Sequence, residues 1–239
     1  MTSEKEFLNA YRNSDFPVPL LTVDSVLFSV KDASLKILLL KRARHPHKSR
    51  WSLPGGFIDI ENDKTTRDTA IRKLTEKTQV TPPYLEQLRT FSGKARDPRG
   101  WSATIAYFAL IAHQEANAIL QHADDAQWVS LNELENYQPL AFDHQEIIQS
   151  ATERLRQKAL YSMLPVFCLP KAFTLGQFHQ VMQIILDKSI QKKSLYRRFE
   201  ASDMFEETGN SLATGARTAK LYRLKKGVEL VSFERNLGQ

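Results

Sequence analysis

The chain has 239 residues, of which 42% are hydrophobic and 25% are charged, with a formal net charge of +6 and one cysteine. Such a chain can bury a core as one large domain or two smaller ones, and its composition excludes a disordered or fibrous protein. No apolar run approaches the ~20 residues that cross a membrane, and the first residues lack the pattern of a signal peptide. We therefore expect a cytoplasmic protein without membrane association, in which Cys168 is a buried thiol.

The first two thirds of the chain alternate between apolar runs and one amphipathic helix. Residues 20–30 and 35–44 are apolar, β-branched runs joined by "KDAS", which predicts a hairpin. A helix is expected over residues 66–78, and further strands over 101–113 and 126–131. A long helix over 143–160 is expected to close this part of the chain.

Charge and proline divide the chain in two. Residues 1–150 hold 18 Lys and Arg against 19 Asp and Glu, whereas residues 151–239 hold 15 against 8. The segment "MLPVFCLPKAF" (163–173) carries two prolines and interrupts the helical pattern. We expect one domain over 1–150 and a second over 151–239, with 143–159 as a connecting helix. The basic excess of the second domain predicts a polyanionic partner.

The segment "GGFIDIENDKTTRDTAIRKLTEKTQV" (55–80) has the outline of a catalytic metal box. On a helix, Arg72, Lys73, Glu76 and Lys77 share one side, which by itself requires only a solvent-exposed surface. A Gly-Gly turn leading to a helix N-terminus is in addition suited to close approach by a phosphate.

This segment resembles the Nudix family, whose box reads G-x5-E-x7-R-E-U-x-E-E-x-G-U, with U apolar. The matching positions are Gly56, Arg72, Leu74, Glu76 and Val80. The departures are Lys64, Lys73 and Lys77 at glutamate positions, Gln79 at a glycine position, and a loop two residues too long. The resemblance covers roughly residues 18–150 and implies an α/β fold with a mixed sheet in an α/β/α sandwich.

The lysines change the chemistry that the box implies. Nudix hydrolases hold Mg²⁺ on box glutamates to activate water. Two ammonium groups in place of two carboxylates change the local charge by about four units, and a single charge at ~4 Å is worth about 4 kcal/mol. We therefore expect no metal, no cofactor and no catalytic residue, and a pocket that binds a nucleotide without cleaving it.

A second segment, "RDPRGW" (96–101), places two arginines before a strand. Guanidinium groups can hold phosphate in a fork, although an ordinary basic turn is an equal alternative from spacing alone. With "LAFDH" (140–144), the segment resembles the ADP-ribose-specific branch of Nudix proteins, which implies ADP-ribose or a related NAD-derived nucleotide. The candidate ligand-binding residues are Arg44, Trp51, Gly55, Gly56, Phe57, Arg72, Lys73, Glu76, Lys77, Phe91, Arg96, Asp97, Arg99 and Tyr107.

The last third of the chain predicts a winged helix-turn-helix. Thr174 and Gln177 form a capping box before an apolar helical face. "DKSI" is a short turn, and a second helix follows in which Leu195 and Phe199 point inward. A hairpin with a basic tip comes next, and this order places the second helix in a DNA major groove. The candidate DNA-binding residues are Lys192, Lys193, Ser194, Tyr196, Arg197, Arg198, Thr214, Gly215, Arg217 and Lys220.

A degenerate Nudix domain followed by a winged helix is similar to the NrtR family, the Nudix-related transcriptional regulators. The resemblance implies a homodimeric repressor of NAD biosynthesis and salvage genes, which reads a palindromic DNA operator and is released by ADP-ribose. Three alternatives stay open. The chain could be an active ADP-ribose pyrophosphatase that uses Glu76, Asp59 and Glu61 as metal ligands; the basic domain could handle RNA; or it could be a helical bundle with a solvated basic face.

Overall fold

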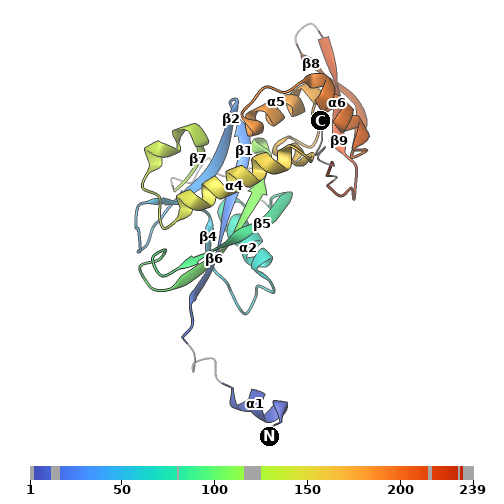
Figure 1. The fold of residues 1–239 in the computed structure, drawn as a ribbon. Helices are drawn as coiled ribbons and strands as arrows, with labels where there is room; N and C mark the ends of the chain where they lie inside the picture. Colours follow the sequence, from blue (N-terminus) through green and yellow to red (C-terminus); the bar gives the residue numbers. More distant parts are fainter. Residues whose placement is uncertain are drawn as a thin grey trace, which may run out of the picture.

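The structure, a computed structural model, describes residues 3–11, 17–79, 81–115, 125–214, 217–230 and 232–233. A short helix, α1 (Glu4–Ala10), lies apart from the rest of the chain in Figure 1. The strands of the first part are β1 (Leu20–Lys31), β2 (Ser34–Lys41), β3 (Trp51–Ser52), β4 (Gly55–Phe57), β5 (Tyr84–Gly93), β6 (Ser102–Leu110) and β7 (Ala126–Ser130). Its helices are α2 (Thr66–Thr78), the 3-10 helix η2 (Leu131–Tyr137) and α4 (His144–Ala159).

Strand β1 is the centre of a mixed sheet. It pairs parallel with β6 and antiparallel with β2 and β4, and β5, β3 and β7 extend the sheet at its sides. The predicted hairpin of β1 and β2 is confirmed, and it turns at Asp32 and Ala33, which both have positive φ (51° and 52°). Two positive φ angles give the turn the twist of the adjoining strands. Residues 22–29 are all buried, as expected of a strand covered on both faces.

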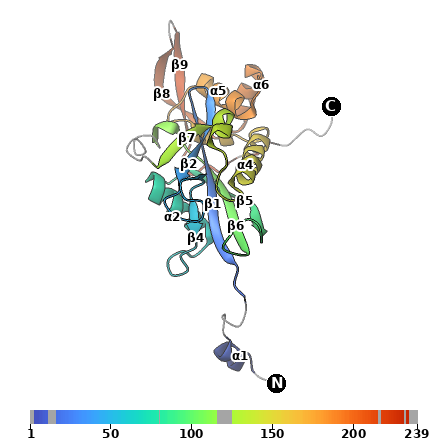
Figure 2. The ribbon, with the colours of Figure 1, turned by 90° about the vertical axis from the view of Figure 1, so that its left-hand side faces the viewer.

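One helix covers each face of this sheet. On one face α2 packs Ala70 and Leu74 against Val23 and Leu27 of β1. On the other face α4 packs Ile147 and its neighbours against the apolar side chains of β1 and β6. The strands run between the two helices in Figure 2. The predicted α/β/α sandwich with a mixed sheet is thus confirmed.

Helix α2 has the bounds that the sequence predicts. Thr65 caps its first turn in a reciprocal capping box with Asp68. It ends at Gln79, which is left-handed (φ 53°). The Nudix box has glycine at this position because a residue without a Cβ adopts this conformation at little cost. Gln79 adopts the same left-handed conformation, at the steric cost that its Cβ adds.

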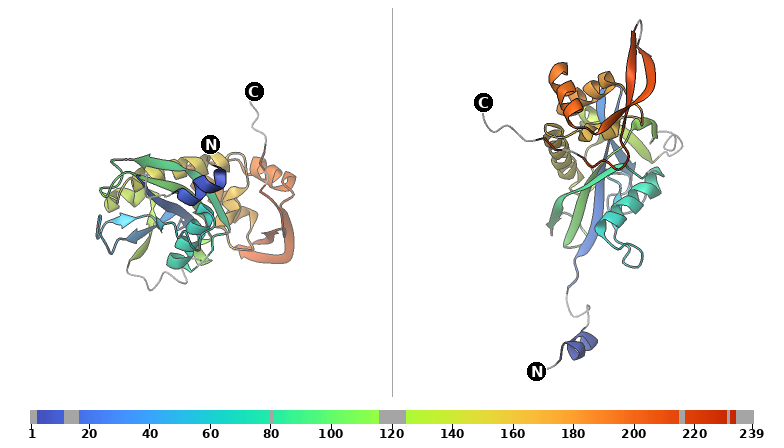
Figure 3. Two further views of the ribbon diagram at one scale, coloured as in Figure 1. Left: turned by 90° about the horizontal axis from the view of Figure 1, so that it is seen from below. Right: turned by 90° about the vertical axis from the view of Figure 1, so that its right-hand side faces the viewer.

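The last part is a winged helix. After the 3-10 helix η3 (Leu164–Cys168) come α5 (Leu175–Leu186), α6 (Lys192–Ala201) and the antiparallel hairpin of β8 (Phe205–Thr214) and β9 (Arg217–Leu224). Figure 3 shows this hairpin projecting beyond α5 and α6. The capping box of Thr174 and Gln177 is confirmed, and so are the inward positions of Leu195 and Phe199. The Phe199 ring stacks on Phe205 with centroids 4.1 Å apart.

The two parts share one hydrophobic core. A single cluster of buried side chains runs from the sheet through α4 and η3 into the winged helix. The proline-containing segment therefore belongs to the core: Leu164, Val166 and Cys168 are all buried within it. Cys168 is a buried thiol as predicted, and burial raises its pKa to about 12. Within the described residues, no helix is both long and apolar enough to span a membrane.

Candidate nucleotide cavity and DNA-binding surface

A cavity of 690 Å³ opens at the end of the sheet where β1 meets β4. This volume falls in the usual range for small-molecule sites. Its lining comes from β1, β2, β4, α2, the loop after β5 and the start of α4. The lining residues are Thr22, Asp24, Leu40, Lys41, Arg42, Ala43, Arg44, Ser52, Leu53, Gly55, Gly56, Phe57, Glu76, Gln79, Arg96, Asp97, Arg99, Asp125, Ala126, Phe142 and His144.

A buried carboxylate, Asp24, forms the floor of this cavity. Its Oδ2 accepts a hydrogen bond from Thr104 Oγ1 at 2.8 Å. Gly55 of β4 passes so close that an added Cβ would lie 2.1 Å from Asp24 Oδ1. The two glycines thus lie in strand β4. Position 55 requires glycine because the backbone there lies against the Asp24 side chain. In the sequence Asp24 is one polar residue within an apolar run, so no sequence pattern marks it as a site residue.

His144 closes the floor as a neutral imidazole. Its Nδ1 accepts the backbone N–H of Leu53 at 2.9 Å, which leaves the ring proton on Nε2, 3.7 Å from Asp24 Oδ1. Complete burial lowers the pKa of His144, with Asp24 acting in the opposite direction. Its motif "LAFDH" was noted in the sequence, but its side chain was not predicted as part of the site.

Arg96 and Arg99 both line the cavity, and both already have carboxylate partners. Arg96 is 7% exposed and donates from Nε and Nη2 to the two oxygens of Asp143, at 2.9 and 2.8 Å. Arg99 is 39% exposed and holds Asp97 in the same forked manner. That their guanidinium groups contact the ligand stays a prediction, which for Arg96 requires an exchange of partners.

Arg42, at the rim of the cavity, was missed by the sequence analysis. Its Nε donates to the Pro46 carbonyl at 2.9 Å, and its guanidinium lies 4.7 Å from the centre of the Phe142 ring. Burial lowers its pKa, and the nearby charge of Arg99 acts in the same direction. With the predicted Arg44, which also lines the cavity, Arg42 gives the rim cationic groups suited to a diphosphate.

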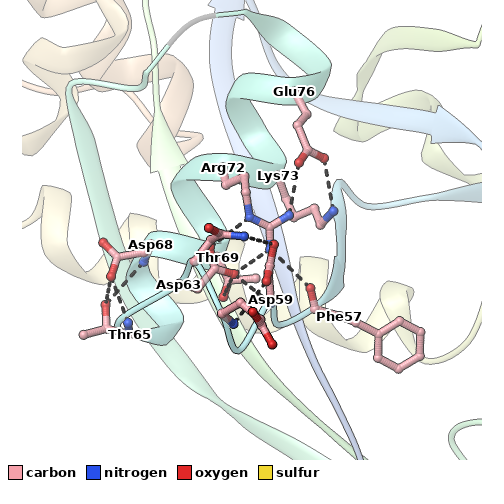
Figure 4. A network of polar contacts seen from close by, with 11 residues as sticks. Phe57, Asp59, Asp63, Thr65, Asp68, Thr69, Arg72, Lys73 and Glu76 are labelled. Atoms are coloured by element: carbon pink, nitrogen blue, oxygen red, sulfur yellow. Dashed lines mark hydrogen bonds and ion pairs between the residues drawn. The ribbon is translucent and has the colours of Figure 1, made fainter.

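The polar side of α2 is a closed ion-pair network, drawn in Figure 4. Arg72 donates to both oxygens of Asp63, with the shorter contact 2.5 Å, and to Glu76 at 3.0 Å. Lys73 Nζ binds the other Glu76 oxygen at 3.1 Å, and its stem packs against Gly56. The remaining box carboxylate is therefore neutralised by two cations.

The carboxylate that pairs with Arg72 lies one residue before the first glutamate position counted in the sequence. Counting eight residues back from Arg72 reaches Lys64, whereas the carboxylate that binds Arg72 belongs to Asp63. The longer loop displaces Lys64, which is exposed. Asp59 accepts bonds from Asn62 and the Glu61 backbone in a local turn. Among the described residues, no group of three or more acidic, His or Cys side chains is placed to hold a metal ion.

Of the aromatic residues predicted to bind the ligand, some line the cavity and others do not. Phe57 and Phe142 both line the cavity, and ligand contact by Phe57 stays a prediction. Phe91 and Tyr107, which the sequence places among the candidate ligand-binding residues, are buried in the cores on opposite faces of the sheet. Trp51 is half-buried and packs edge-on against Tyr137 without lining the cavity.

The predicted basic surface lies on α6. The side chains of Lys192, Lys193 and Arg197 are exposed, and those of Ser194 and Tyr196 are half-buried. Arg198 is also exposed, but its Nη1 donates to the Leu160 carbonyl at the end of α4, at 2.7 Å. In the hairpin, Lys220 forms an ion pair with Glu207 at 2.7 Å. The predictions for Gly215 and for the side chains of Lys77, Thr214 and Arg217 lie outside the described residues.

Comparisons with known proteins match both parts. The family described as the NUDIX domain matches residues 19–151, and the NrtR DNA-binding winged helix domain matches 165–224. The "ADPR responsive transcriptional repressor NtrR" of Acinetobacter baylyi is 44% identical over 93% of this chain and 88% of its own length. An ADP-ribose pyrophosphatase of Methanocaldococcus jannaschii is 34% identical over 55% of this chain and 72% of its own.

Solved structures match equally well. Shewanella oneidensis NrtR complexed with a 27mer DNA is 46% identical, with a TM-score of 0.83, covering 86% of this chain and 93% of that chain. The NUDIX domain of the same protein complexed with ADP ribose is 45% identical, with a TM-score of 0.59, covering 64% and 99%. Fold and cavity thus define a Nudix domain followed by a winged helix DNA-binding domain. The chain belongs to the NrtR family.

The Asp63–Arg72 pair predicts a pH dependence of stability. Hydrogen bonds from Arg72 hold the pKa of Asp63 well below its usual range. A carboxyl with a lowered folded pKa stabilises the fold above its unfolded pKa, near 3.9, and loses this contribution as the pH falls further. The Asp63→Asn variant should therefore be less stable than the original chain at pH 7, and the gap should narrow below about pH 4.

Urea unfolding followed by circular dichroism at several pH values measures this gap. Glu153→Gln, on the exposed side of α4, is the matched acid-to-amide control and should show no such narrowing. A gap for Asp63→Asn that is constant from pH 7 to pH 3 would contradict the assignment of the pair.

Proposed function

We propose that this chain is an ADP-ribose-responsive transcriptional repressor that binds its ligand without cleaving it. The observation that carries the proposal is one molecule holding both a cavity with a cationic rim and an exposed basic helix. One relative that matches along most of the chain carries the same pair of functions in its name, and another is solved with DNA.

In this proposal the nucleotide lies in the cavity between the glycine strand and the arginines. The rim arginines Arg42, Arg44 and Arg99 hold the diphosphate, and Phe57 and Phe142 offer ring faces to the base or ribose. Asp24 and His144 are buried groups that can meet ribose hydroxyls from below. A charge-assisted bond of this kind is worth about 1.5–3 kcal/mol.

DNA is bound by the winged helix, with α6 as the recognition helix. Arginine reads guanine edges, and lysine neutralises phosphate, which fits Arg197 beside Lys192 and Lys193. We propose that the protein acts as a homodimer on a palindromic operator, because a two-fold protein reads a two-fold site. The proposed targets are genes of NAD biosynthesis and salvage. Within the chain, 1–150 senses the nucleotide and 151–239 binds DNA, with 143–159 connecting them.

Ligand-controlled DNA binding is the outcome that tests the proposal. Fluorescence anisotropy with operator DNA should show affinity falling to a plateau as ADP-ribose is added. Arg197→Ala should weaken DNA binding and leave ADP-ribose affinity intact, because the two surfaces are separate. Lys64→Ala removes the same charge from an exposed loop of the first domain and should leave DNA binding intact. Operator binding that saturating ADP-ribose does not change would overturn the proposed regulation.

The chemistry of the box gives a second expected outcome. Glu76 is bound by Arg72 and Lys73, and Lys73 occupies a position where the family box has a metal-binding glutamate. We expect no Mg²⁺-dependent hydrolysis of ADP-ribose, even though a pyrophosphatase is among the relatives. Chromatography of AMP release at high protein concentration measures it. Turnover that is proportional to protein and abolished by chelator would instead establish an active pyrophosphatase with an added DNA-binding domain.

A further inference from the structure

The N-cap of α4 holds a carboxylate that does not cap the helix. Asp143 is the N-cap residue, yet its side chain makes no capping hydrogen bond, and its backbone (φ −97°, ψ 22°) lies outside the extended region that N-caps adopt. Both of its oxygens are instead bound by Arg96. A carboxylate at this position normally accepts N–H groups of the first turn and interacts favourably with the helix dipole. The ion pair with Arg96 replaces these contacts.

Backbone strain lies directly beside this ion pair. Phe142 has a φ of 53°, a region that bulky side chains rarely adopt. Its ring is held over the cavity by Arg42 and by His144. Residues 142 and 143 therefore hold an arrangement that costs free energy and that the Arg96–Asp143 pair maintains.

Arg96 also lines the cavity, where an anion would compete for it. Its guanidinium is nearly buried, and besides Asp143 it reaches Ser102 and lies 3.9 Å from Asp24. Arginine binds carboxylate and phosphate in the same forked geometry, so a diphosphate in the cavity offers an equivalent partner. An exchange would release Asp143 to cap α4, and every group would again be paired. The structure shows the first of these two sets of hydrogen bonds, in which Arg96 binds Asp143.

Helix α4 connects this site with the DNA-binding helices. It crosses the sheet and reaches α5 (Figure 1). At its far end Arg156 donates to the Ile185 carbonyl of α5 at 3.2 Å, and the Leu160 carbonyl accepts Arg198 of α6. Leu155 and Ala159 are buried in the core that includes Leu195 of α6. The last turns of α4 are therefore packed against both α5 and α6, so a shift of these turns would move the two helices.

The helix also has a fixed point on the sheet. Glu86 of β5 forms ion pairs with Arg154 and Lys158, and Lys158 further contacts Tyr84. These contacts lie in the C-terminal half of α4. The N-terminal half is held to the sheet by the buried side chains of Ile147 and Ile148, and its exposed pair of Arg89 with Glu146 is of a kind that contributes little free energy. Because the Glu86 contacts lie beside Arg156 and Leu160, a shift that reaches α5 and α6 must also change the contacts of Arg154 and Lys158 with Glu86.

We propose that ADP-ribose draws Arg96 away from Asp143, that the freed Asp143 carboxylate caps α4, and that the resulting shift of α4 repositions α5 and α6. Asp143 is then a positioning residue that couples the two sites. This inference rests on the proposed function, because it explains how the ligand releases DNA. It satisfies the requirement that a ligand shifts an equilibrium only through contacts that differ between the two states.

The variant Asp143→Asn tests the exchange. An amide holds Arg96 weakly and can cap α4 with or without ligand, so the free protein shifts toward the released state. ADP-ribose affinity should rise, operator affinity without ligand should fall, and the ratio of operator affinities without and with ADP-ribose should decrease. Loss of a negative charge alone would strengthen DNA binding, so the expected fall is opposite to the electrostatic effect.

Two further variants complete the experiment. Glu153→Gln on the same helix removes the same charge and should leave the ratio of operator affinities without and with ADP-ribose unchanged. Arg156→Gln, at the far end of α4, should lower the ratio without changing ADP-ribose affinity in the absence of DNA. Arg156→Gln also tests the proposed coupling through α4 if Asp143→Asn fails to fold.

Calorimetry for ADP-ribose and anisotropy for DNA give all the affinities required. If the original chain shows coupling, and the foldable variants among Asp143→Asn and Arg156→Gln keep the full ratio, the inference is overturned and the proposed function stands. An original chain that binds both partners without coupling would overturn the proposed function and this inference together.

Discussion

Helix α4 is the element on which the arrangement of the molecule depends. It is buried against the sheet along one side, it begins at the cavity floor with His144, and its last turns enter the core of the winged helix. The two parts are therefore joined by packed side chains, and a rearrangement of one part must displace the other. A close-packed core changes between discrete arrangements and deforms little between them. This property lets a small ligand influence a DNA-binding surface through α4.

The structure of the box does not depend on metal ligands. Arg72 and Asp63 fix the loop to α2, and the packing of Leu74 and Ala70 needs no metal. The lysines change the charge of the box. Lys73 binds Glu76, and its positive charge favours binding of an anion and disfavours binding of a metal cation. A sensor needs an intact ligand, so these substitutions fit binding and disfavour hydrolysis.

Much of the fold follows from local sequence signals. The β1–β2 hairpin, the bounds of α2, the Thr174 capping box and the inward Leu195 and Phe199 all arise from patterns within a few residues. Strand β5 was not foreseen, because its half-exposed residues follow no clear alternation. The partners of Arg96 and the register of Asp63 depend on contacts across loops and on loop length. The sequence also places Phe91 among the candidate ligand-binding residues, whereas in the structure its side chain is buried in the core.

Reciprocal coupling tests the central claim, that nucleotide binding and DNA binding oppose each other in one molecule. Calorimetry can measure ADP-ribose affinity for the free protein and for the protein saturated with operator DNA. The account predicts weaker ADP-ribose binding to the DNA complex, by the same factor by which ADP-ribose weakens DNA binding. Equal ADP-ribose affinity in the two states would contradict it.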